Sequence, residues 1–468
     1  MRRKKSLPML NDVQITGIAA EGKAIARHED MVIFVPFLAP GDIADIQVIK
    51  KRRRYLEGRA TGLKTSSSLR ATPFCEHFGV CGGCKWQHLK YEHQLRYKQQ
   101  QVLDHFERIG KLELPDVEPI LPSRETMYYR NKLEFTFTNR RWMTDEEIAT
   151  GKEISEFRGA GFHIPGRFDK VLDINTCYLQ KDPSNDIRLS IKNFAIRHDL
   201  DFFDLRDQQG FLRTLIIRTS ITGEVMVIVV FFRDDREMRE ALLNHLMLEF
   251  PGITSLMYVI NPKANDTITD LEVKLFAGRD HIVEEMEELK FKVGPKSFYQ
   301  TNSGQAYELY KIVRDYTLPR KHEVIYDLYT GTGTIAAFIA RHCSRVCGLE
   351  YVPEAIEDAR FNAENNNLSN ISFYSGDIRE ILTPGFVDQN GKPDTIITDP
   401  PRNGMHPDVV DRLIGILPEK IVYVSCNSAT QARDIQMLDK MYRVERMRAV
   451  DMFPHTQHVE NVTLLVRR

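Results

Sequence analysis

The chain has 468 residues, of which 42% are hydrophobic and 28% are charged, a balance that is ordinary for a globular protein. This length exceeds that of a single core, so we expect two or three domains. The longest apolar run, Val225 to Phe232, is too short to cross a bilayer, and the basic start MRRKKSLPML has no apolar segment behind it that would suit a secretory signal. We therefore expect a cytoplasmic protein without membrane contact.

Positive charge is concentrated at the start of the chain. Residues 1–70 hold 14 Lys and Arg against 7 Asp and Glu, a net of +7, so the rest carries −8 of the total of −1. The basic residues gather in 2–5 and in 50–54. Such clusters can neutralise phosphates and favour nucleic-acid contact, although a frayed tail and a solvated strand end would look the same.

The first part of the chain reads as an all-β module. Residues 11–64 contain five short β-prone runs that Gly, Pro and Asp turns separate. Five such strands fit an OB-like barrel, a frequent nucleic-acid binder, and a barrel without a binding role would look alike. A polar linker follows at 65–73. Apolar residues at helical spacing then predict a helix over 89–110.

The pattern of the remaining chain changes near residue 300. Residues 125–300 look β-rich, with a hairpin that turns at Thr222-Gly223 and a polar surface insertion at 142–159. From about 300, apolar strand-like runs alternate with helical segments. This alternation predicts an open, mostly parallel α/β sheet.

A glycine-rich turn follows the first of these later strands. Thr330-Gly-Thr-Gly-Thr lets the backbone approach a ligand at a helix N-terminus, and Glu350 ends the next strand where a carboxylate can bind ribose hydroxyls. A dinucleotide is one possible ligand, but position 336 is Ala where G-x-G-x-x-G requires Gly. Asp327, before the turn, suits a cation better than a pyrophosphate. With Asp377 after the third strand, the pattern favours S-adenosylmethionine.

Two further strands end in reactive residues. Asp399 ends one strand before a Pro-Pro corner, and Cys426 ends another. A thiolate that adds to C6 of uracil makes C5 nucleophilic enough to accept a methyl group, and a base must then remove the C5 proton. Glu460 is the candidate base, with His455 and His458 as alternatives.

The other reading of Cys426 is a buried small hydrophobic residue, which is a common fate of a free cysteine. Polar neighbours on both sides and the end of the strand favour the functional reading. Cys343 and Cys347, in a helix-to-strand context, read instead as packing residues.

A second group of cysteines lies near the predicted helix. Cys75, Cys81 and Cys84 form a C-x5-C-x2-C cluster on a glycine-bent loop, and Cys177 is the free candidate for a fourth ligand. Zinc and an iron–sulfur cluster both need such a set, and a redox pair is the remaining alternative. Nearby, MYYRNKLEF (127–135) interleaves aromatic residues with cations, which favours RNA contact, although amphipathic strands look similar.

Five motifs occur together in a fixed order. They are SFYQTNSGQ (297–305), DLYTGTGT (327–334), ITDPPRNG (397–404), VYVSCN (422–427) and HVENVTLL (458–465). With them, nearly the whole chain resembles the RNA uracil-5-methyltransferases, specifically the 23S ribosomal-RNA branch with an N-terminal TRAM domain and an iron–sulfur cluster.

The resemblance implies a role for each matching residue. Cys426 would be the nucleophile and Glu460 the base, and the four clustered cysteines would hold a 4Fe–4S cluster. Thr330 and Thr334 stand where better-known members often have Cys and Asn. The positions that would meet S-adenosylmethionine or the target base are Gln300, Tyr329, Thr334, Glu350, Asp377 and Asp399.

The resemblance also implies the architecture. A TRAM, OB-like barrel would occupy residues 1–68. A central β-rich domain with the cysteine cluster would follow at 69–296, with the helix at 89–110 packed on the catalytic domain. A Rossmann-like methyltransferase domain would occupy 297–468. The expected partner is RNA, first 23S rRNA and otherwise tRNA, and we expect a monomer.

Other functions fit the residues less well. Enzymes that methylate an amino group carry an aromatic residue after Asp/Asn-Pro-Pro, where this chain has Arg402. Radical S-adenosylmethionine enzymes space their cysteines as C-x3-C-x2-C. A non-catalytic iron–sulfur RNA-binding protein would not need Cys426, Asp399 and Glu460 together.

Overall fold

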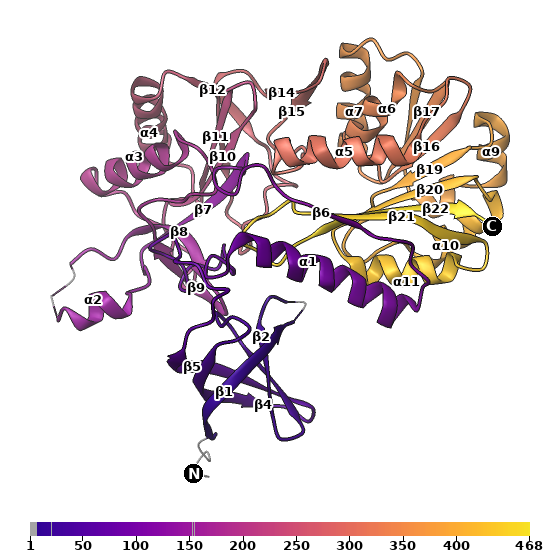
Figure 1. The fold of residues 1–468 in the computed structure, drawn as a ribbon. Coiled ribbons are helices and arrows are strands. Elements are labelled where there is room, and N and C mark those ends of the chain that lie inside the picture. The colour runs from indigo at the N-terminus through magenta and orange to yellow at the C-terminus, as the bar shows by residue number, and fades with distance from the viewer. Residues whose placement is uncertain (1–6, 20, 152, 154) are drawn as a thin grey trace.

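The computed structural model describes residues 7–19, 21–151, 153 and 155–468. The basic residues at 2–5 lie outside this described part. In Figure 1 the N-terminal barrel hangs below two larger α/β bodies, with the central part on the left and the C-terminal part on the right. Sheets organise all three parts: a closed barrel, a seven-stranded sheet and an eight-stranded sheet, together with a separate two-stranded sheet.

The N-terminal part is the closed five-stranded barrel that the sequence predicts. Neighbouring strands follow the order β1-β2-β3-β5-β4 around it. A Cβ atom at Gly58 would lie 2.3 Å from Ile46 Cγ2, so glycine is required where β5 crosses closely over β4. The strands are β1 (Met9–Ile18), β2 (Ala24–His28), β3 (Met31–Val35), β4 (Ile43–Lys51) and β5 (Tyr55–Thr65).

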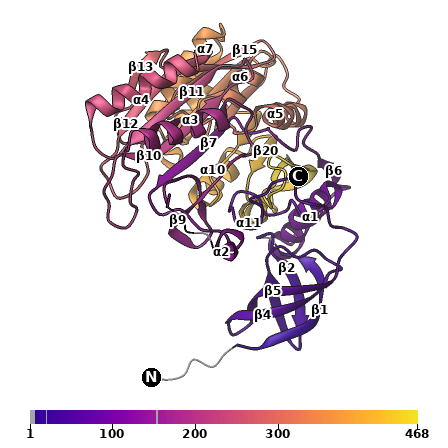
Figure 2. The same ribbon diagram turned by 90° about the vertical axis from the view of Figure 1, so that its left-hand side faces the viewer.

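A long helix leads away from the cysteine-rich loop. Helix α1 spans Tyr91–His105, and a wider π-helical turn, η1, continues it over Phe106–Gly110. Both lie along α11 (Ser428–Leu438) from the far end of the chain, which Figure 2 shows from the side. The segment that follows the barrel therefore reaches the C-terminal part.

The central part is a mixed sheet with the strand order β13-β12-β11-β10-β7-β8-β9. The hairpin between β10 and β11 turns at Gly223 (φ +85°), as predicted. The predicted insertion at 142–159 contains the short helix α2 (Asp145–Ala149), and its last residue, Gly159, begins β8. The strands are β7 (Lys132–Thr138), β8 (Gly159–Ile164), β9 (Arg167–Asp173), β10 (Leu212–Thr219), β11 (Val225–Phe231), β12 (Ile253–Ile260) and β13 (Lys274–Gly278).

Both faces of the central sheet are covered. One face of β11, with Val227 and Val229, packs on α3 (Ser184–Arg197) and α4 (Arg236–Glu249). The other face, with Ile228, belongs to a core that extends into the C-terminal part. Every residue of β11 is consequently buried, which explains its uninterrupted apolar run.

The C-terminal part is the predicted α/β fold. Its sheet has the order β18-β17-β16-β19-β20-β22-β21-β6, and its first five strands are parallel. Strand β22 runs antiparallel to both β20 and β21. The strands are β16 (Val324–Leu328), β17 (Arg345–Glu350), β18 (Ile371–Ser375), β19 (Thr395–Thr398), β20 (Lys420–Ser425), β21 (Tyr442–Val450) and β22 (Glu460–Arg467).

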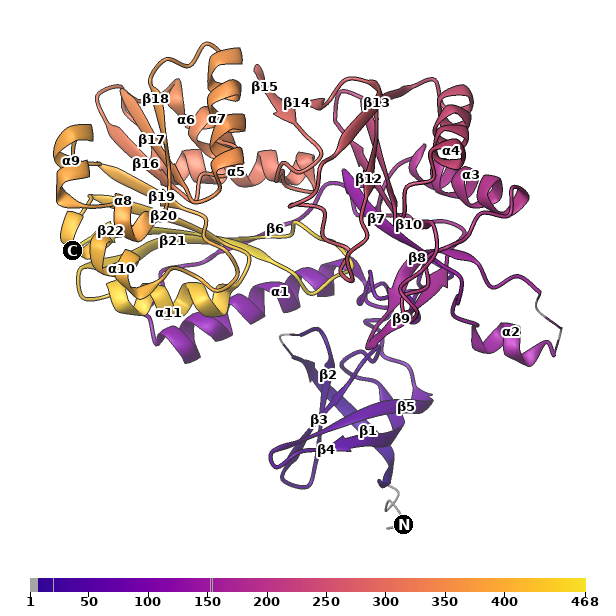
Figure 3. The ribbon, with the colours of Figure 1, turned by 180° about the vertical axis from the view of Figure 1, so that it is seen from behind.

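Helices flank this sheet on both sides, as Figure 3 shows from behind. The edge strand β6 (Glu118–Leu121) comes from the first third of the chain and was not predicted. The helices are α5 (Ser303–Thr317), α6 (Thr334–Ala340), α7 (Pro353–Asn365), α8 (Ile378–Ile381), α9 (Pro384–Asn390), α10 (Pro407–Ile416) and α11.

A small two-stranded sheet lies between the two bodies. Its strands are β14 (Ile282–Met286) and β15 (Leu289–Val293), and β15 packs against α6 and α7. Residues 282–293 therefore pack with the C-terminal helices. The boundaries at 68 and 296 stay predictions.

Within the part of the chain that is described, no helix has the length and apolar character needed to span a membrane.

Candidate active site at the carboxyl ends of the parallel strands

The glycine-rich turn follows β16 and opens α6. Tyr329 adopts φ +61°, and Gly331 and Gly333 adopt φ +55° and +76°. A Cβ atom at Gly331 would meet nothing within 4 Å, so the space above this glycine is open to a ligand. The Glu350 carboxylate accepts hydrogen bonds from the backbone N–H groups of Gly331 (3.1 Å) and Val352 (3.0 Å). The strand ends thereby fix Glu350 beside the turn.

Two aspartates lie under this turn at the ends of adjacent strands. Asp327 is 1% exposed and accepts a hydrogen bond from the Thr330 hydroxyl (2.5 Å), while its Oδ1 atom has no partner among the described residues. Burial raises the pKa of Asp327 to about 7. Burial and the charge of Asp327 raise the pKa of Asp399 to about 7 as well. A buried Asp327 and a partly buried Asp399, both with raised pKa values, favour a cationic ligand, which would stabilise their charged forms.

The other predicted cofactor residues surround the same strand ends. Thr334 begins α6, and its hydroxyl lies 3.2 Å from the Tyr310 hydroxyl. Gln300 lies in the loop before α5, where its carbonyl accepts a hydrogen bond from Asn131 Nδ2 (2.9 Å). Asp377 caps α8 and pairs with Arg379, which lowers the pKa of Asp377 to about 2.

These residues fit S-adenosylmethionine. Its sulfonium and ammonium groups are cations, and the Oδ1 atom of Asp327 is a buried, free acceptor beside the open turn in the described part of the chain. Glu350 is placed where a carboxylate accepts hydrogen bonds from ribose hydroxyls in doubly wound folds.

Strand register brings Cys426 and Glu460 together. In the antiparallel pair of β20 and β22, Ser425 lies opposite Asn461, so one further step sets Cys426 opposite Glu460. On its other side Glu460 lies opposite Val450 of β21. The sequence predicted Cys426 at the end of its strand and Glu460 at the entry to the last strand, and the structure brings both to the same edge as Asp399.

The acidic groups at this edge repel one another when they are ionised. Burial and the charge of Asp399 raise the pKa of Glu460 to about 8. Burial and the charges of Glu460 and Asp399 raise the pKa of the Cys426 thiol to about 11. In the free protein, both the thiol and the carboxyl group therefore hold their protons at neutral pH.

Arg402 is a residue of this site that the sequence analysis did not assign. The positive charge of its guanidinium group partly offsets the increase in the pKa of both Cys426 and Glu460. The Arg402 carbonyl accepts hydrogen bonds from Asn427 Nδ2 (2.9 Å) and from the Thr430 hydroxyl (3.2 Å), so α11 holds the loop that carries it. The signal was present in the motif DPPRNG, but only its Asp was given a role.

The two alternative bases are held differently. The backbone N–H of His455 donates to Gln94 Oε1 (2.9 Å), and Gln94 Nε2 contacts His455 Nδ1 (3.2 Å). His458 lies among four cations, and burial together with these charges lowers its pKa to about 4. Burial also lowers the pKa of His455 to about 4. Both rings are largely neutral near pH 7, and α1 engages that of His455.

The four predicted cluster ligands face one another. Cys75, Cys81, Cys84 and Cys177 line a single cavity together with Phe74, Phe162 and Leu179. Burial and the charges of the other three thiols raise the pKa of Cys177 to about 12. Among the described residues, no group of three or more His, Cys, Asp or Glu side chains is placed to hold a metal ion. Thiolates are ligands of both zinc and iron–sulfur clusters, so the donor set of this cavity is chemically suited to either group.

The predicted RNA-contact stretch is partly internal. Tyr129 is 6% exposed, and its hydroxyl donates to the Pro454 carbonyl (3.0 Å), so it is not available to stack on a base. Lys132 pairs with Glu134 (2.6 Å). Arg130 lies over the Phe453 ring, 5.2 Å from its centroid. The aromatic and cationic pattern therefore serves packing at Tyr129 and leaves Tyr128 half-buried.

Two family models match the chain. The model of the tRNA (uracil-5-)-methyltransferases matches residues 221–468, and that of the TRAM domain matches residues 11–61. The first covers more than half of the chain, and the second coincides with the barrel.

Known relatives match over nearly the full length. An uncharacterized RNA methyltransferase of Bacteroides thetaiotaomicron is 57% identical over 96% of this chain and 100% of its own length. One from Chlorobaculum tepidum is 38% identical over 97% and 96%. The crystal structure of Pyrococcus abyssi tRNA (uracil-54, C5)-methyltransferase in complex with S-adenosyl-L-homocysteine is similar with a TM-score of 0.75 and 31% identity, covering 97% of this chain and 99% of that one.

The fold, the strand-end site and these matches define an S-adenosylmethionine-dependent RNA methyltransferase. Within that class, the chain belongs to the tRNA (uracil-5-)-methyltransferase family and carries a TRAM domain.

Proposed function

We propose that this protein methylates C5 of a uridine in a structured RNA, with Cys426 as the nucleophile and Glu460 as the base. The observation that carries the proposal is the strand register that sets Cys426 opposite Glu460, with Asp399 and Arg402 close enough to shift the pKa of both. A methyltransferase that only brought a donor to an already nucleophilic amine would not need a thiol and a protonatable carboxyl group side by side.

The residues divide the reaction into an addition and an elimination. The Cys426 thiolate adds to C6 of the uracil, a C–S bond forms, and the electron pair moves to C5 and O4 as an enolate. S-adenosylmethionine supplies the methyl group that C5 takes. Glu460 then accepts the C5 proton, the C–S bond breaks, and the thiolate leaves as the 5,6 double bond returns.

The site must become charged for this reaction. Arg402 is the cation that lowers the pKa of Cys426, and it therefore supports formation of the thiolate. The donor would be held by Gln300, Tyr329, Thr334, Glu350, Asp377 and Asp399. The target nucleotide must leave its stack to reach Cys426, so we include base flipping in the proposal.

A 4Fe–4S cluster bound by Cys75, Cys81, Cys84 and Cys177 is part of the proposal, with a structural role and no step of the reaction. The shared cavity supports it. Zinc ligands converge on one point at about 2.3 Å, whereas four irons spread their thiolates further apart. Protein purified without oxygen should contain iron and sulfide in equal amounts and absorb visible light. Stoichiometric zinc without iron would contradict this.

We propose 23S rRNA as the first candidate substrate, because the family branch with a TRAM domain and a cysteine cluster acts on it. The solved archaeal relative, a tRNA (uracil-54, C5)-methyltransferase, favours tRNA as the second. We place the enzyme in the cytoplasm as a monomer. Mapping 5-methyluridine in both RNA fractions from a strain without the gene distinguishes the two substrates. The RNA that contains the site which loses its methyl group is the substrate.

Trapping tests the chemistry. RNA from the same strain, grown with 5-fluorouracil, carries fluorine at C5, which blocks proton removal. Incubated with S-adenosylmethionine, wild-type protein should form an adduct with this RNA that survives denaturation, and Cys426→Ala should form none. Cys343→Ala, which changes a buried cysteine before the start of β17, is the matched control. Methylation of normal RNA by Cys426→Ala at the wild-type rate would refute the mechanism.

A further inference from the structure

We propose that helix α1 positions Glu460 through a buried ion pair, in which Lys98 of α1 binds Asp451 at the start of the loop that leads to Glu460. This inference rests on the base role proposed for Glu460 and adds two positioning residues to that reaction. Residues 451–459 connect β21 to β22, and the two ends of this connection meet where Val450 lies opposite Glu460. Asp451 directly follows Val450, the residue that lies opposite Glu460. The contact of Lys98 with Asp451 therefore acts one residue away from the strand partner of Glu460.

The ion pair is completely buried. Both side chains are 0% exposed, and Lys98 Nζ lies 2.5 Å from Asp451 Oδ1 although 353 residues separate them. Lys98 also donates to the Phe453 carbonyl (3.0 Å), and the Tyr91 hydroxyl donates to Asp451 Oδ2 (2.8 Å). Each charged group therefore has further hydrogen bonds, as a buried pair needs if it is to persist in one geometry.

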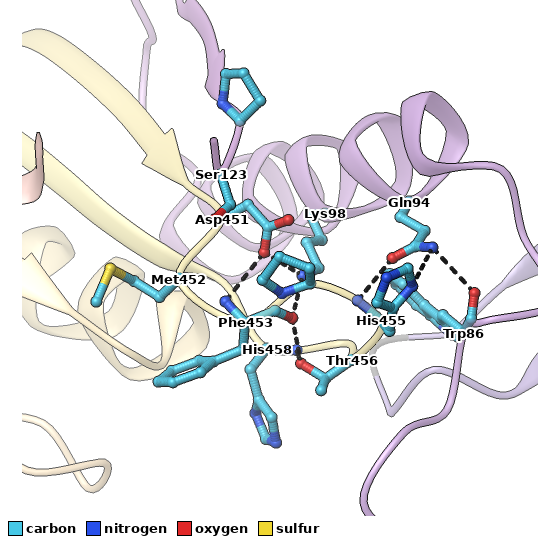
Figure 4. A network of polar contacts seen from close by, with 12 residues as sticks. Trp86, Gln94, Lys98, Ser123, Asp451, Met452, Phe453, His455, Thr456 and His458 are labelled. Atoms are coloured by element: carbon cyan, nitrogen blue, oxygen red, sulfur yellow. Dashed lines mark hydrogen bonds and ion pairs between the residues drawn. The ribbon is translucent and has the colours of Figure 1, made fainter. Parts of the chain in front are cut away.

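The same face of α1 holds the next turn of the loop. Gln94 Nε2 contacts His455 Nδ1 (3.2 Å), and Gln94 Oε1 accepts from the His455 N–H (2.9 Å). Figure 4 shows Gln94 and Lys98 on neighbouring turns of the helix, both directed at this loop. Two side chains of one rigid helix thus fix the loop at three points: Asp451, Phe453 and His455.

The cysteine-rich segment holds the loop from a second direction. The backbone N–H groups of Lys85 and Trp86 donate to the His455 carbonyl (2.8 and 3.0 Å), directly after Cys84. The Trp86 indole N–H donates in turn to the Gly22 carbonyl of the barrel (2.9 Å). The loop, all of which is described, has no regular secondary structure of its own, so these contacts determine its course.

Position matters more for Glu460 than for most residues of the protein. A base accepts a proton only within hydrogen-bond reach of it, and a displacement of about 1 Å can cost on the order of a hundredfold in rate. Cys426 follows β20, and in the described structure no hydrogen bond of Gln94 or Lys98 reaches that strand. Loss of the anchors should therefore slow elimination and spare the addition and methyl transfer.

Two variants test this separation. Lys98→Met/Asp451→Asn removes both charges together, which avoids a lone buried ion, and Gln94→Leu removes the second anchor without changing any charge. With RNA from the gene-deletion strain grown on 5-fluorouracil, both variants should form as much adduct as wild type, because that adduct needs no base. With normal RNA from the same strain, they should accumulate adduct and turn over on the order of tenfold to a hundredfold more slowly.

The matched control is Gln99→Leu. Gln99 lies on the same helix and also bonds backbone groups, but those of Glu118 and Ile120 in β6. The Gln99→Leu variant should accumulate no adduct on normal RNA and should turn over at the wild-type rate.

The outcomes distinguish the proposed function from the positioning role of α1. No adduct between wild type and fluorinated RNA refutes the proposed function itself. With wild-type adduct present, equal loss of adduct and turnover in Gln94→Leu shows a general structural role and overturns the positioning proposal. Turnover at the wild-type rate in either variant also overturns the positioning proposal. If the double variant does not fold, Gln94→Leu alone decides.

Discussion

Glu460 is a carboxyl group that the folded protein keeps neutral. Its pKa lies near 8 because burial disfavours the charged form and Asp399 adds repulsion, whereas an ordinary glutamate has a pKa of 4.5. The folded state therefore holds a proton that the unfolded chain releases as pH rises. The stability that this residue contributes is fully present below about pH 4.5 and is lost as pH rises to about 8.

This argument predicts how Glu460→Gln changes the pH dependence of stability. Glutamine stays neutral, so the variant should gain in thermal midpoint relative to wild type as pH rises between about 5 and about 8. Thermal unfolding at constant ionic strength measures the difference. The control is Glu113→Gln, which makes the same substitution at an exposed glutamate. A pH-independent difference for Glu460→Gln would show that the residue is ionised throughout.

Several residues of the site could be predicted from the sequence because they end strands. Parallel strands align their carboxyl ends, so Asp327, Glu350, Asp399 and Cys426 had to meet at one edge once their strands were recognised. The roles of Arg402 and Lys98 could not be predicted in this way. Lys98 lies in a helix rich in Gln, Lys and Arg, where a lysine ordinarily faces water, and its partner is 353 residues away. No local pattern distinguishes a lysine with such a partner.

At the scale of elements, the loop before α5 depends on the central sheet. Asn131, just before β7, donates through Nδ2 to the Gln300 carbonyl (2.9 Å) and to the Ser303 hydroxyl (2.7 Å), and its N–H donates to the Thr301 carbonyl (2.8 Å). A central-domain residue thereby sets the course of a segment proposed to meet the donor.

We expect Asn131→Ala to weaken S-adenosylhomocysteine binding. The variant loses two side-chain hydrogen bonds, each worth about 1 kcal/mol, so the dissociation constant should rise by up to roughly thirtyfold. Titration calorimetry measures it. The control is Asn139→Ala, whose amide instead donates to Asp204 within the central part (3.0 Å), and which should bind as wild type does. Equal affinities for the two variants would mean that the loop holds its course without Asn131.

The elements that escaped prediction share a cause. The α/β alternation after residue 300 predicted the right sheet, since each strand there carries its own apolar pattern. Strand β6 has four residues and forms only on the edge that β21 offers. Helix α1 was expected over 89–110, and its last turn is instead the wider η1, because Phe106 is buried against the α11 side of the core. Tertiary contacts determine such segments.

At the scale of the molecule, the barrel presents unpaired charge. Lys51 ends β4, and Arg52, Arg53 and Arg54 form the turn to β5. All four side chains are exposed, and none of them forms an ion pair with a described residue. The +7 charge of residues 1–70 thus includes a basic turn on a part of the molecule that hangs away from the catalytic strands (Figure 1). Such a turn suits RNA backbone outside the target stem.

Arg52→Ser/Arg53→Ser/Arg54→Ser should weaken RNA binding and leave the maximal rate unchanged. Each phosphate that these arginines no longer neutralise should also flatten the slope of log affinity against log salt by about 0.7 to 0.9. Binding to deletion-strain RNA at several salt concentrations measures both. Lys111→Ser/Arg412→Ser/Lys440→Ser removes the same number of exposed charges from the catalytic part. If the two triple variants lose affinity equally, the barrel turn has no special role.

The pairing of Lys98 with Asp451 has a consequence for the order of events during synthesis. A growing chain emerges N-terminus first, and its early domains fold before later ones exist. Helix α1 is made early, yet the carboxylate that neutralises Lys98 follows 353 residues later in the chain. Until Asp451 has been synthesised, Lys98 lacks this partner and must stay solvated. A nascent or truncated chain that stops before Asp451 therefore cannot fix the loop that leads to Glu460 in the way that the folded protein does.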